Sequence, residues 1–489
     1  MYNTKSLFTR AKYQINQTVA WKMLSDDQCE EIVMTAFELL ERTGADVLSA
    51  EALELLKEAG CAVQGKRVRI PSAKLEWALR AAPSRVTLCD RNGKRAILME
   101  TDNVHFGPGF GSELTLDIET GKARKMLKSD VSNMAKICGG LKNIDFVTSF
   151  GTPTDVSATS AELHSFEALA GNTVKPILQP VKNKIQAGAV IEMAAAVKGG
   201  IDALRMDPFV VLYLPANEPL VHGEDEIAAL MLAAKNGVPA AYANNLVAGL
   251  TAPDHSAGAI VVALANSLVG LLISQLVKKG APFITGGFFT YNDTINGLHP
   301  YGAPEVSLMG TGYANVLRYL RLPSLGFAGA SDSKTTDAQM GLESAFSILH
   351  AGLSGTNMIY GAGLNESGAL SSPYLLVMSD EVMAMTKRIM DGVEVNEDKL
   401  ARGVIDKVQP GGHYLGEPHT TYYFRTEQFW PKLMNRKRFD DWVAAGSKTL
   451  GTRTAEMTQS LLSLREPDTL PPDVSKKLAD IIADAEKQM

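Results

Sequence analysis

The run PFVVLYLP at residues 208–215 decides the fold class, because a short apolar segment bounded by prolines is typical of a parallel strand buried on both faces. Comparable runs recur roughly every 30 to 40 residues on both sides of it. They are DFVTSFG from Asp145, PILQPV from Pro176, PAAYANN from Pro239, APFITGG from Ala281, PSLGFAG from Pro323 and NMIYGAG from Asn357. An eighth strand is expected near Ala369 to Leu376.

Amphipathic segments fill the spaces between these runs and predict crossover helices. The expected helices cover residues 184–197, 225–235, 256–279, 306–319, 337–353 and 379–391. Eight such units predict an α/β protein of the (β/α)8 TIM-barrel class, and the alternative is a doubly wound open sheet. The barrel is favoured because no strand is followed at once by a GxGxxG turn into a helix, which also leaves dinucleotide binding weakly supported.

Three regions are expected along the chain. Residues 1–140 predict an N-terminal helical segment and a β-hairpin region, because helical spacing there gives way to short apolar runs separated by Gly and Asn. Residues 141–400 form the predicted barrel. Residues 401–489 are expected to form a C-terminal strap and helices that pack on the barrel.

Composition limits the range of functions. The chain has 489 residues and a formal net charge of −6, so it lacks the basic excess of nucleic-acid-binding proteins. Its four cysteines are widely spaced and form no pair with zinc-ligand spacing, so no metal site is expected. The first twenty residues carry no apolar core of a secretory signal, which predicts a cytoplasmic protein. Polar residues interrupt the most apolar stretch, residues 257–277, which favours a buried helix over a membrane span.

Aromatic and amide side chains dominate the ends of the predicted strands, where a β/α barrel carries its site. Few Lys or Arg residues accompany them, so the pattern favours a cationic ligand held by aromatic faces over a phosphorylated one. Phe289 and Tyr291 are expected to stand beyond their strand, after a turn at Gly286 and Gly287. The predicted lining residues are Tyr213, Tyr242, Asn244, Phe289, Tyr291, Phe327, Asp332, Lys334 and Tyr360.

Two groups in this set have a plainer explanation. Tyr213 and Tyr242 alternatively cap the barrel interior, with their hydroxyl groups reaching solvent. The run from Asp332 to Lys334 alternatively forms a solvated start of the next helix. No nucleophile elbow, HExxH or Walker motif occurs, so the substrate itself is reactive or a partner brings the cofactor.

Four stretches together resemble the trimethylamine methyltransferase (MttB) family over nearly the whole chain. They are FGPGFGSELTLDIETGKARKMLKSDVSNMAKICGGLKNIDFV from Phe106, GASDSKTTDAQMGLES from Gly329, NMIYGAG from Asn357, and GGHYLGEPHT from Gly411 followed by FWPKLMNR. The resemblance implies a TIM barrel that moves a methyl group from a methylated amine to the cobalt of a separate corrinoid protein. Archaeal trimethylamine members contain pyrrolysine, whereas this sequence has only the twenty standard residues.

Members without pyrrolysine resemble the glycine betaine:corrinoid methyltransferase type. The resemblance therefore implies a quaternary amine substrate, such as glycine betaine, proline betaine, carnitine or γ-butyrobetaine, and no tightly bound cofactor, because the partner supplies the cobalamin. Phe106, which opens the first shared stretch, joins the predicted substrate-binding set. His413 and His419 lie in the last shared stretch and are expected to face the site, whereas Tyr422 to Phe424 and Trp430 to Leu433 are expected to strap the C-terminal helices to the barrel.

Two other functions stay open beside this one. The chain is alternatively a non-catalytic betaine-binding barrel, or a barrel enzyme of other chemistry, because one fold hosts many reactions. A homo-oligomer is expected in each case. Tyr414 and Trp430 are candidates for contact with the corrinoid partner or with a second subunit.

Overall fold

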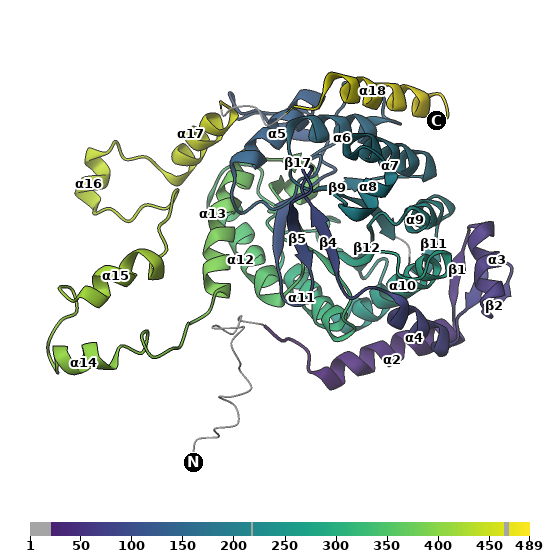
Figure 1. Ribbon diagram of the computed structural model, residues 1–489, viewed down its shortest axis with the longest axis horizontal. Helices are drawn as coiled ribbons and strands as arrows, with labels where there is room; N and C mark the ends of the chain where they lie inside the picture. Colours follow the sequence, from purple (N-terminus) through teal and green to yellow (C-terminus); the bar gives the residue numbers. More distant parts are fainter. Residues whose placement is uncertain (1–20, 217–218, 464–468) are drawn as a thin grey trace, which may run out of the picture.

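A ring of parallel strands surrounded by helices forms the centre of the molecule (Figure 1). The computed structural model describes residues 21–216, 219–463 and 469–489. Seven strands form one sheet in the spatial order β6-β15-β14-β13-β12-β10-β9, and every pairing is parallel. They are β6 (His105–Pro108), β9 (Ile177–Pro180), β10 (Val210–Ala216), β12 (Ala240–Ala248), β13 (Phe283–Tyr291), β14 (Ser324–Phe327) and β15 (Met358–Ala362).

Residues 144–147 close the ring between its two edge strands. Ile144 pairs with Phe106 of β6, and Val147 pairs with Ile177 of β9, both in parallel. The amide of Asp145 donates to the Phe106 carbonyl at 2.7 Å, and the amide of Leu178 donates to the Val147 carbonyl at 2.9 Å. The predicted (β/α)8 barrel is therefore confirmed, with residues 144–147 in the eighth position.

The eighth strand is not where the sequence pattern placed it. Leu370 and Ser371 form β17, which pairs with β16 (Leu364–Asn365) and β7 (Leu114–Leu116) in a separate sheet. Ser372 then caps helix α13 (Pro373–Met390) through its side chain. The barrel strand that the sequence pattern missed is β6, whose sequence HFGP carries too little apolar character to stand out from the hairpins around it.

The predicted crossover helices are present and surround the ring (Figure 1). They begin and end close to the expected positions, although α13 starts six residues earlier than predicted, at Pro373 rather than Ser379. The helices that cover the strands are α6 (Ala161–Asn172), α7 (Lys184–Lys198), α9 (Glu224–Asn236), α10 (Ser256–Val277), α11 (Pro304–Tyr319), α12 (Ala338–Ser354) and α13.

Alternating side chains along each strand divide the core into two parts. Leu212 and Tyr242 belong to the large cluster between the sheet and its helices, whereas Val211 and Tyr213 belong to a separate cluster inside the ring. The hairpin of β4 (Val86–Cys89) and β5 (Arg95–Met99) fills one end of this interior with Val86, Leu88, Ile97 and Met99. Figure 1 shows this hairpin crossing the centre of the ring.

Helix α10 is the only helix among the described residues that is long and apolar enough to cross a membrane. Fifteen of its residues are buried, and it packs against α2 (Asp26–Arg42), α4 (Ser72–Ala81), α9 and α11. It is a core helix of the barrel, as its interrupting polar residues predict.

Shorter elements lie around the barrel. On the N-terminal side, α3 (Ala50–Glu58) follows β1 (Ala45–Val47), which pairs with β3 (Arg67–Arg69) and β11 (Val221–His222), while β2 (Ala62–Gln64) pairs with β3. Strand β8 (Ala123–Lys125) pairs with β7, and α5 (Lys128–Gly140) and α8 (Ile201–Met206) complete this part of the chain. On the C-terminal side, α14 (Arg402–Val408), α15 (Pro418–Glu427) and α16 (Phe439–Ala444) project away from the ring, while α17 (Leu450–Leu462) and α18 (Pro472–Glu486) return to it (Figure 1).

Candidate functional site

A cavity of about 520 Å³ opens at the C-terminal ends of the barrel strands. It lies above the filled ring interior, at the end where β/α barrels carry their sites. Its walls come from β10, β12, β13, β14 and β15 and from the loops that follow β6, β13 and β15. The lining residues are Phe110, Tyr213, Asn245, Val247, Phe288, Thr290, Gly297, Leu298, His299, Tyr301, Phe327, Tyr360, Leu364, Glu366, Ser367 and Ala369.

Six aromatic rings form a continuous wall of this cavity. Phe327 lies at the centre, with its ring centroid 4.6 Å from Phe288, 5.2 Å from Tyr301 and 5.3 Å from Tyr360. Tyr360 in turn stacks on Phe110 at 5.2 Å. The sixth ring, Tyr213, lies edge-on to Phe110 at 4.8 Å and to Tyr360 at 5.8 Å. The rings support one another, so their faces are held in place before any ligand binds.

The tyrosine hydroxyl groups of this wall stay protonated. Burial raises the pKa of Tyr213 and raises the pKa of Tyr360 well above its ordinary value. Burial also raises the pKa of Tyr301 to about 12. The Tyr213 hydroxyl donates to Asn245 Oδ1 at 2.9 Å and lies 3.4 Å from the Tyr360 hydroxyl. These groups can orient a ligand through hydrogen bonds but hold no negative charge at physiological pH.

Glu366 is the one carboxylate that lines the cavity, and neither lysine nor arginine lines it. No hydrogen bond or ion pair with another described residue engages its side chain, and its backbone amide is held by the Ser333 carbonyl at 3.2 Å. His299 also faces the cavity, and its buried Nδ1 has no hydrogen-bond partner among the described residues. An aromatic cavity with a single fixed negative charge favours a ligand that carries a positive one.

Asp332 holds two walls of the cavity together from behind. Its carboxylate accepts the amide N–H of Tyr301 at 2.8 Å, the amide N–H of Gly302 at 2.9 Å and the Ser367 hydroxyl at 2.9 Å. Glu366 and Ser367 both have left-handed backbones, with φ of 50° and 51°. Such a conformation is rare for residues other than glycine and persists only where the surroundings fix it. Asp332 is therefore a positioning residue, and it does not line the cavity itself.

The structure brings three of the predicted lining residues into the cavity and turns three others away. Tyr213, Phe327 and Tyr360 line it. Tyr242, Asn244 and Phe289 point to the helical side of the sheet, because they occupy the alternate positions of β12 and β13. The Tyr242 hydroxyl lies 2.7 Å from His222 Nδ1, Asn244 donates to the Ser267 hydroxyl at 2.9 Å, and Phe289 packs against Tyr313 at 5.3 Å.

The expected turn at Gly286 and Gly287 is not formed, because β13 continues through both glycines to Tyr291. A side chain does not fit there, since a Cβ on Gly286 would lie 1.7 Å from the Leu325 carbonyl oxygen. The uninterrupted strand keeps the alternation, so Phe288 and Thr290 face the cavity. Tyr291 lies on the opposite side and packs against the outer core.

Four further predicted residues lie outside the cavity. Phe106 is fully buried on β6 between the sheet and the helices, with the Lys387 ammonium 5.8 Å from its ring centroid. Lys334 is exposed, and its ammonium donates to the Asp332 carbonyl at 2.7 Å. His413 is exposed, and His419 packs at a tilt against Tyr423, with ring centroids 4.7 Å apart, within the projecting C-terminal segment. The expectation that the two histidines face the site does not match this placement.

Several cavity residues were not predicted, and they come from loops. Phe110 follows β6, while Leu298, His299 and Tyr301 belong to the connection between β13 and α11. Phe288, Asn245 and Glu366 do occur at the strand ends that the pattern identified, but neighbouring residues were preferred to them. In the structure, the two-residue alternation within β12 and β13 places Asn245 and Phe288 on the cavity side and Asn244 and Phe289 on the helical side.

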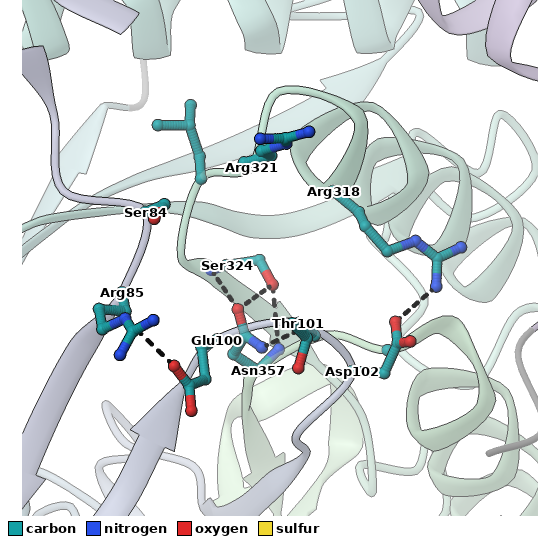
Figure 2. A pocket seen from close by; sticks show the side chains of 11 residues that line it. Ser84, Arg85, Glu100, Thr101, Asp102, Arg318, Arg321, Ser324 and Asn357 are labelled. Atoms are coloured by element: carbon teal, nitrogen blue, oxygen red, sulfur yellow. Dashed lines mark hydrogen bonds and ion pairs between the residues drawn. The ribbon is translucent and has the colours of Figure 1, made fainter. Parts of the chain in front are cut away.

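A second cavity, of about 440 Å³, lies at the opposite end of the barrel. Ser324 and Asn357, at the N-terminal ends of β14 and β15, form part of its wall (Figure 2). Its charged side chains are largely paired, since Arg318 contacts Asp102 at 2.8 Å and Arg85 contacts Glu100 at 3.3 Å. β/α barrels carry their active sites at the C-terminal ends of the strands, where the aromatic cavity lies. The aromatic cavity is therefore the candidate site.

The fold and the cavity define a β/α-barrel protein with a preformed aromatic site for a small ligand. The chain belongs to the trimethylamine methyltransferase (MTTB) family, whose model matches residues 3–489. It is a methyltransferase of that family, and the resemblance stated from its motifs is confirmed.

Two relatives and one solved structure illustrate this membership. The chain is 32% identical to the trimethylamine methyltransferase MttB of Desulfitobacterium hafniense (strain DSM 10664 / DCB-2), across 95% of this chain and 94% of that protein. It is 31% identical to the glycine betaine methyltransferase of Desulfitobacterium hafniense (strain Y51), across 96% and 98%. The crystal structure of the Methanosarcina barkeri monomethylamine methyltransferase shares the fold, with a TM-score of 0.50 and 15% identity across 98% of this chain and 97% of that one.

Proposed function

We propose that this protein transfers a methyl group from a quaternary amine to Co(I) of a separate corrinoid protein. Glycine betaine and the related compounds proline betaine, carnitine and γ-butyrobetaine are the candidate substrates. The observation that carries the proposal is the wall of six aromatic rings around a cavity whose lining contains one carboxylate and neither lysine nor arginine. Family membership and the glycine betaine methyltransferase among the relatives support it.

The chemistry of a quaternary amine suits this cavity. The nitrogen is already a cation, so the amine leaves as a neutral molecule and needs no proton from the protein. The electron pair of Co(I) forms the new bond to the methyl carbon, while the electron pair of the broken C–N bond stays on the nitrogen. The protein has to orient the methyl group and exclude water, which are the tasks of a rigid aromatic pocket.

The cavity walls provide two forces for the ammonium group. Each aromatic face contributes about 0.5–2 kcal/mol through cation–π attraction. Glu366 adds a half-buried carboxylate at the cavity wall, and its charge attracts a cation. Neither force needs a change in protonation, since the phenol groups stay neutral.

A betaine also carries a carboxylate, which requires hydrogen-bond donors. Lys334, Asn244, His413 and His419 carry N–H donors but do not line the cavity. Asn245, His299, the Tyr301 hydroxyl and the Ser367 hydroxyl do line it, and all of them can donate to a carboxylate oxygen. We assign this task to His299 first, because its ring has a buried nitrogen without a partner among the described residues.

The corrinoid partner must approach the open side of the cavity. Three apolar side chains stand exposed on the loops that surround this opening, namely Leu250 after β12 and Ile295 and Leu298 after β13. Ile295 is 94% exposed, and it forms an apolar group with the other two. These loops are the proposed docking surface for the corrinoid domain. All four cysteines are buried free thiols, in keeping with the reducing cytoplasm that Co(I) chemistry requires.

Replacing one ring of the cage tests the proposal directly. Phe327→Leu removes the central aromatic face and keeps an apolar side chain, so affinity for a quaternary ammonium ligand is expected to fall about two- to thirtyfold. Isothermal titration calorimetry with glycine betaine and γ-butyrobetaine measures this change. Phe289→Leu is the matched control, because Phe289 is on the same sheet but faces the helices. Equal affinities in both variants would count against the cage.

A further inference from the structure

We propose that Glu343 of α12 is a positioning residue of the aromatic cavity, and that it acts through the loop that follows β14. Glu343 does not line the cavity itself. Its carboxylate instead holds the segment on which two of the cavity walls depend. The effect on ligand binding rests on the proposed function, because these walls belong to the cavity that we assign to the quaternary amine.

Three neutral groups hold the carboxylate of Glu343 in one orientation. Its Oε2 atom accepts the Ser331 hydroxyl and the Asp332 amide N–H, both at 2.7 Å. Its Oε1 atom accepts the side-chain amide of Gln339, one turn earlier on α12, at 2.9 Å. Hydrogen bonds to a carboxylate are stronger than those between neutral groups. The start of the loop after β14 is therefore fixed to α12.

This loop carries Asp332, which binds both walls. The Asp332 carboxylate accepts the Tyr301 amide at 2.8 Å and the Ser367 hydroxyl at 2.9 Å. The carbonyl of the residue after Asp332 accepts the Glu366 amide at 3.2 Å. Tyr301, Glu366 and Ser367 all line the cavity. A displacement of Glu343 would thus reach an aromatic ring of the wall and the carboxylate that faces the ligand.

Gly302 shows that the Glu343 carboxylate occupies a fixed place. A Cβ on Gly302 would lie 2.4 Å from Glu343 Cδ and 2.5 Å from Glu343 Oε2, which is far too close. The backbone does not require glycine here, since the φ of Gly302 lies outside the left-handed region. Gly302 also donates its amide N–H to the Asp332 carboxylate at 2.9 Å. Glycine therefore fits at position 302 because the hydrogen-bonded Glu343 lies against it.

Helix α12 has its own cap and does not depend on Glu343 for its start. Asp337 caps the helix by accepting the Met340 amide at 3.0 Å. The bond between Glu343 and the exposed Gln339 stays within the helix, whereas the two bonds of Oε2 leave it. The geometry of Glu343 therefore serves the loop after β14 more than it serves the helix.

Three variants change this connection in different ways. Glu343→Ala removes it, and Gly302→Ala displaces the carboxylate from outside. Glu343→Gln is the conservative variant, because its amide oxygen can replace Oε2 and keep both bonds to the loop, while Gln339 can turn its own amide to match. Gln339→Ala and Gly310→Ala are the matched controls, since a Cβ on Gly310 of α11 meets nothing within 4 Å. Circular dichroism checks that each variant is folded.

Hydrogen exchange followed by mass spectrometry reports on the loops directly. Peptides that contain the amides of Tyr301, Asp332 and Glu366 are expected to exchange about tenfold faster in Glu343→Ala and in Gly302→Ala, because the acceptors of these amides are no longer held. Glu343→Gln and the two controls are expected to stay within about twofold of the wild type. Faster exchange along α12 without any change in the three loop peptides would overturn the proposal.

Ligand affinity is the second readout, measured by isothermal titration calorimetry with tetramethylammonium and with glycine betaine. Affinity is expected to fall about five- to twentyfold in Glu343→Ala and in Gly302→Ala. The double variant is expected to lose no more than either single variant, because both changes remove the same connection. Additive losses, or a loss that Glu343→Gln shares, would overturn the proposal. A wild type that binds neither probe would instead contradict the proposed function, and the exchange rates would then decide the role of Glu343.

Discussion

Asp332 links two loops of the cavity through hydrogen bonds that an amide cannot reproduce. Its carboxylate accepts two backbone N–H groups and one hydroxyl, whereas an asparagine side chain offers one oxygen. Asp332→Asn is expected to lower the free energy of unfolding by about 1–3 kcal/mol and to weaken ligand binding, because Tyr301 and Ser367 are no longer held. Chemical denaturation and calorimetry measure the two effects. Asp293→Asn is the control, since the Asp293 side chain in the same connection accepts the Ile295 amide through one oxygen, Oδ1. Equal losses in both variants would contradict the positioning role.

The positions of the individual lining residues show how much of the site the sequence pattern predicts. Three of the aromatic residues predicted at strand ends, Tyr213, Phe327 and Tyr360, line the cavity. Tyr242 carries the same signal but sits one position out of phase, behind the sheet. Which alternate residues of a strand face the inside of the ring depends on where that strand enters the ring. A run such as PAAYANN contains no polar and apolar alternation that reveals this. His299 and Tyr301 come from an irregular loop, whose path no periodicity describes.

At the scale of elements, the β4–β5 hairpin closes the far end of the ring and so forms the floor below the cavity. Leu88 is fully buried among interior side chains, whereas Leu98 on the paired strand is exposed. Leu88→Ala is expected to lower the free energy of unfolding by about 2–5 kcal/mol, through lost burial and the space left behind. Leu98→Ala is expected to change it by less than about 0.5 kcal/mol. Urea denaturation measures the free energy of unfolding of both variants. If Leu88→Ala lowers it no more than Leu98→Ala does, the hairpin is not part of the core.

Strand and helix patterns predicted most of the barrel because it repeats one unit, a buried parallel strand followed by an amphipathic helix. Buried parallel strands and amphipathic helices each have a strong local signature. The element that escaped prediction was β6, since its four residues include two with little apolar surface and its partners are far away in the sequence. An eighth barrel strand was expected near Ala369 to Leu376, but only Leu370 and Ser371 form a strand there, outside the barrel sheet, and α13 begins at Pro373.

At the scale of the whole molecule, the two ends of the barrel have different tasks. The C-terminal ends of the strands carry an aromatic cavity with exposed apolar loops around it, which suits a small ligand and a large partner that approaches from outside. The other end is closed by the β4–β5 hairpin. The corrinoid protein that we propose as a partner therefore approaches the C-terminal ends of the strands.

Methyl transfer from a quaternary amine tests the central claim most directly. The protein is incubated with a cognate corrinoid protein held as Co(I) and with glycine betaine, proline betaine, carnitine or γ-butyrobetaine in turn, and the visible spectrum follows methylation of the corrinoid. We expect methylation with at least one of the quaternary amines and none with trimethylamine, because a tertiary amine is a poor methyl donor and the chain has no pyrrolysine. Absence of methylation with every quaternary amine, or methylation with trimethylamine alone, would contradict the proposed function.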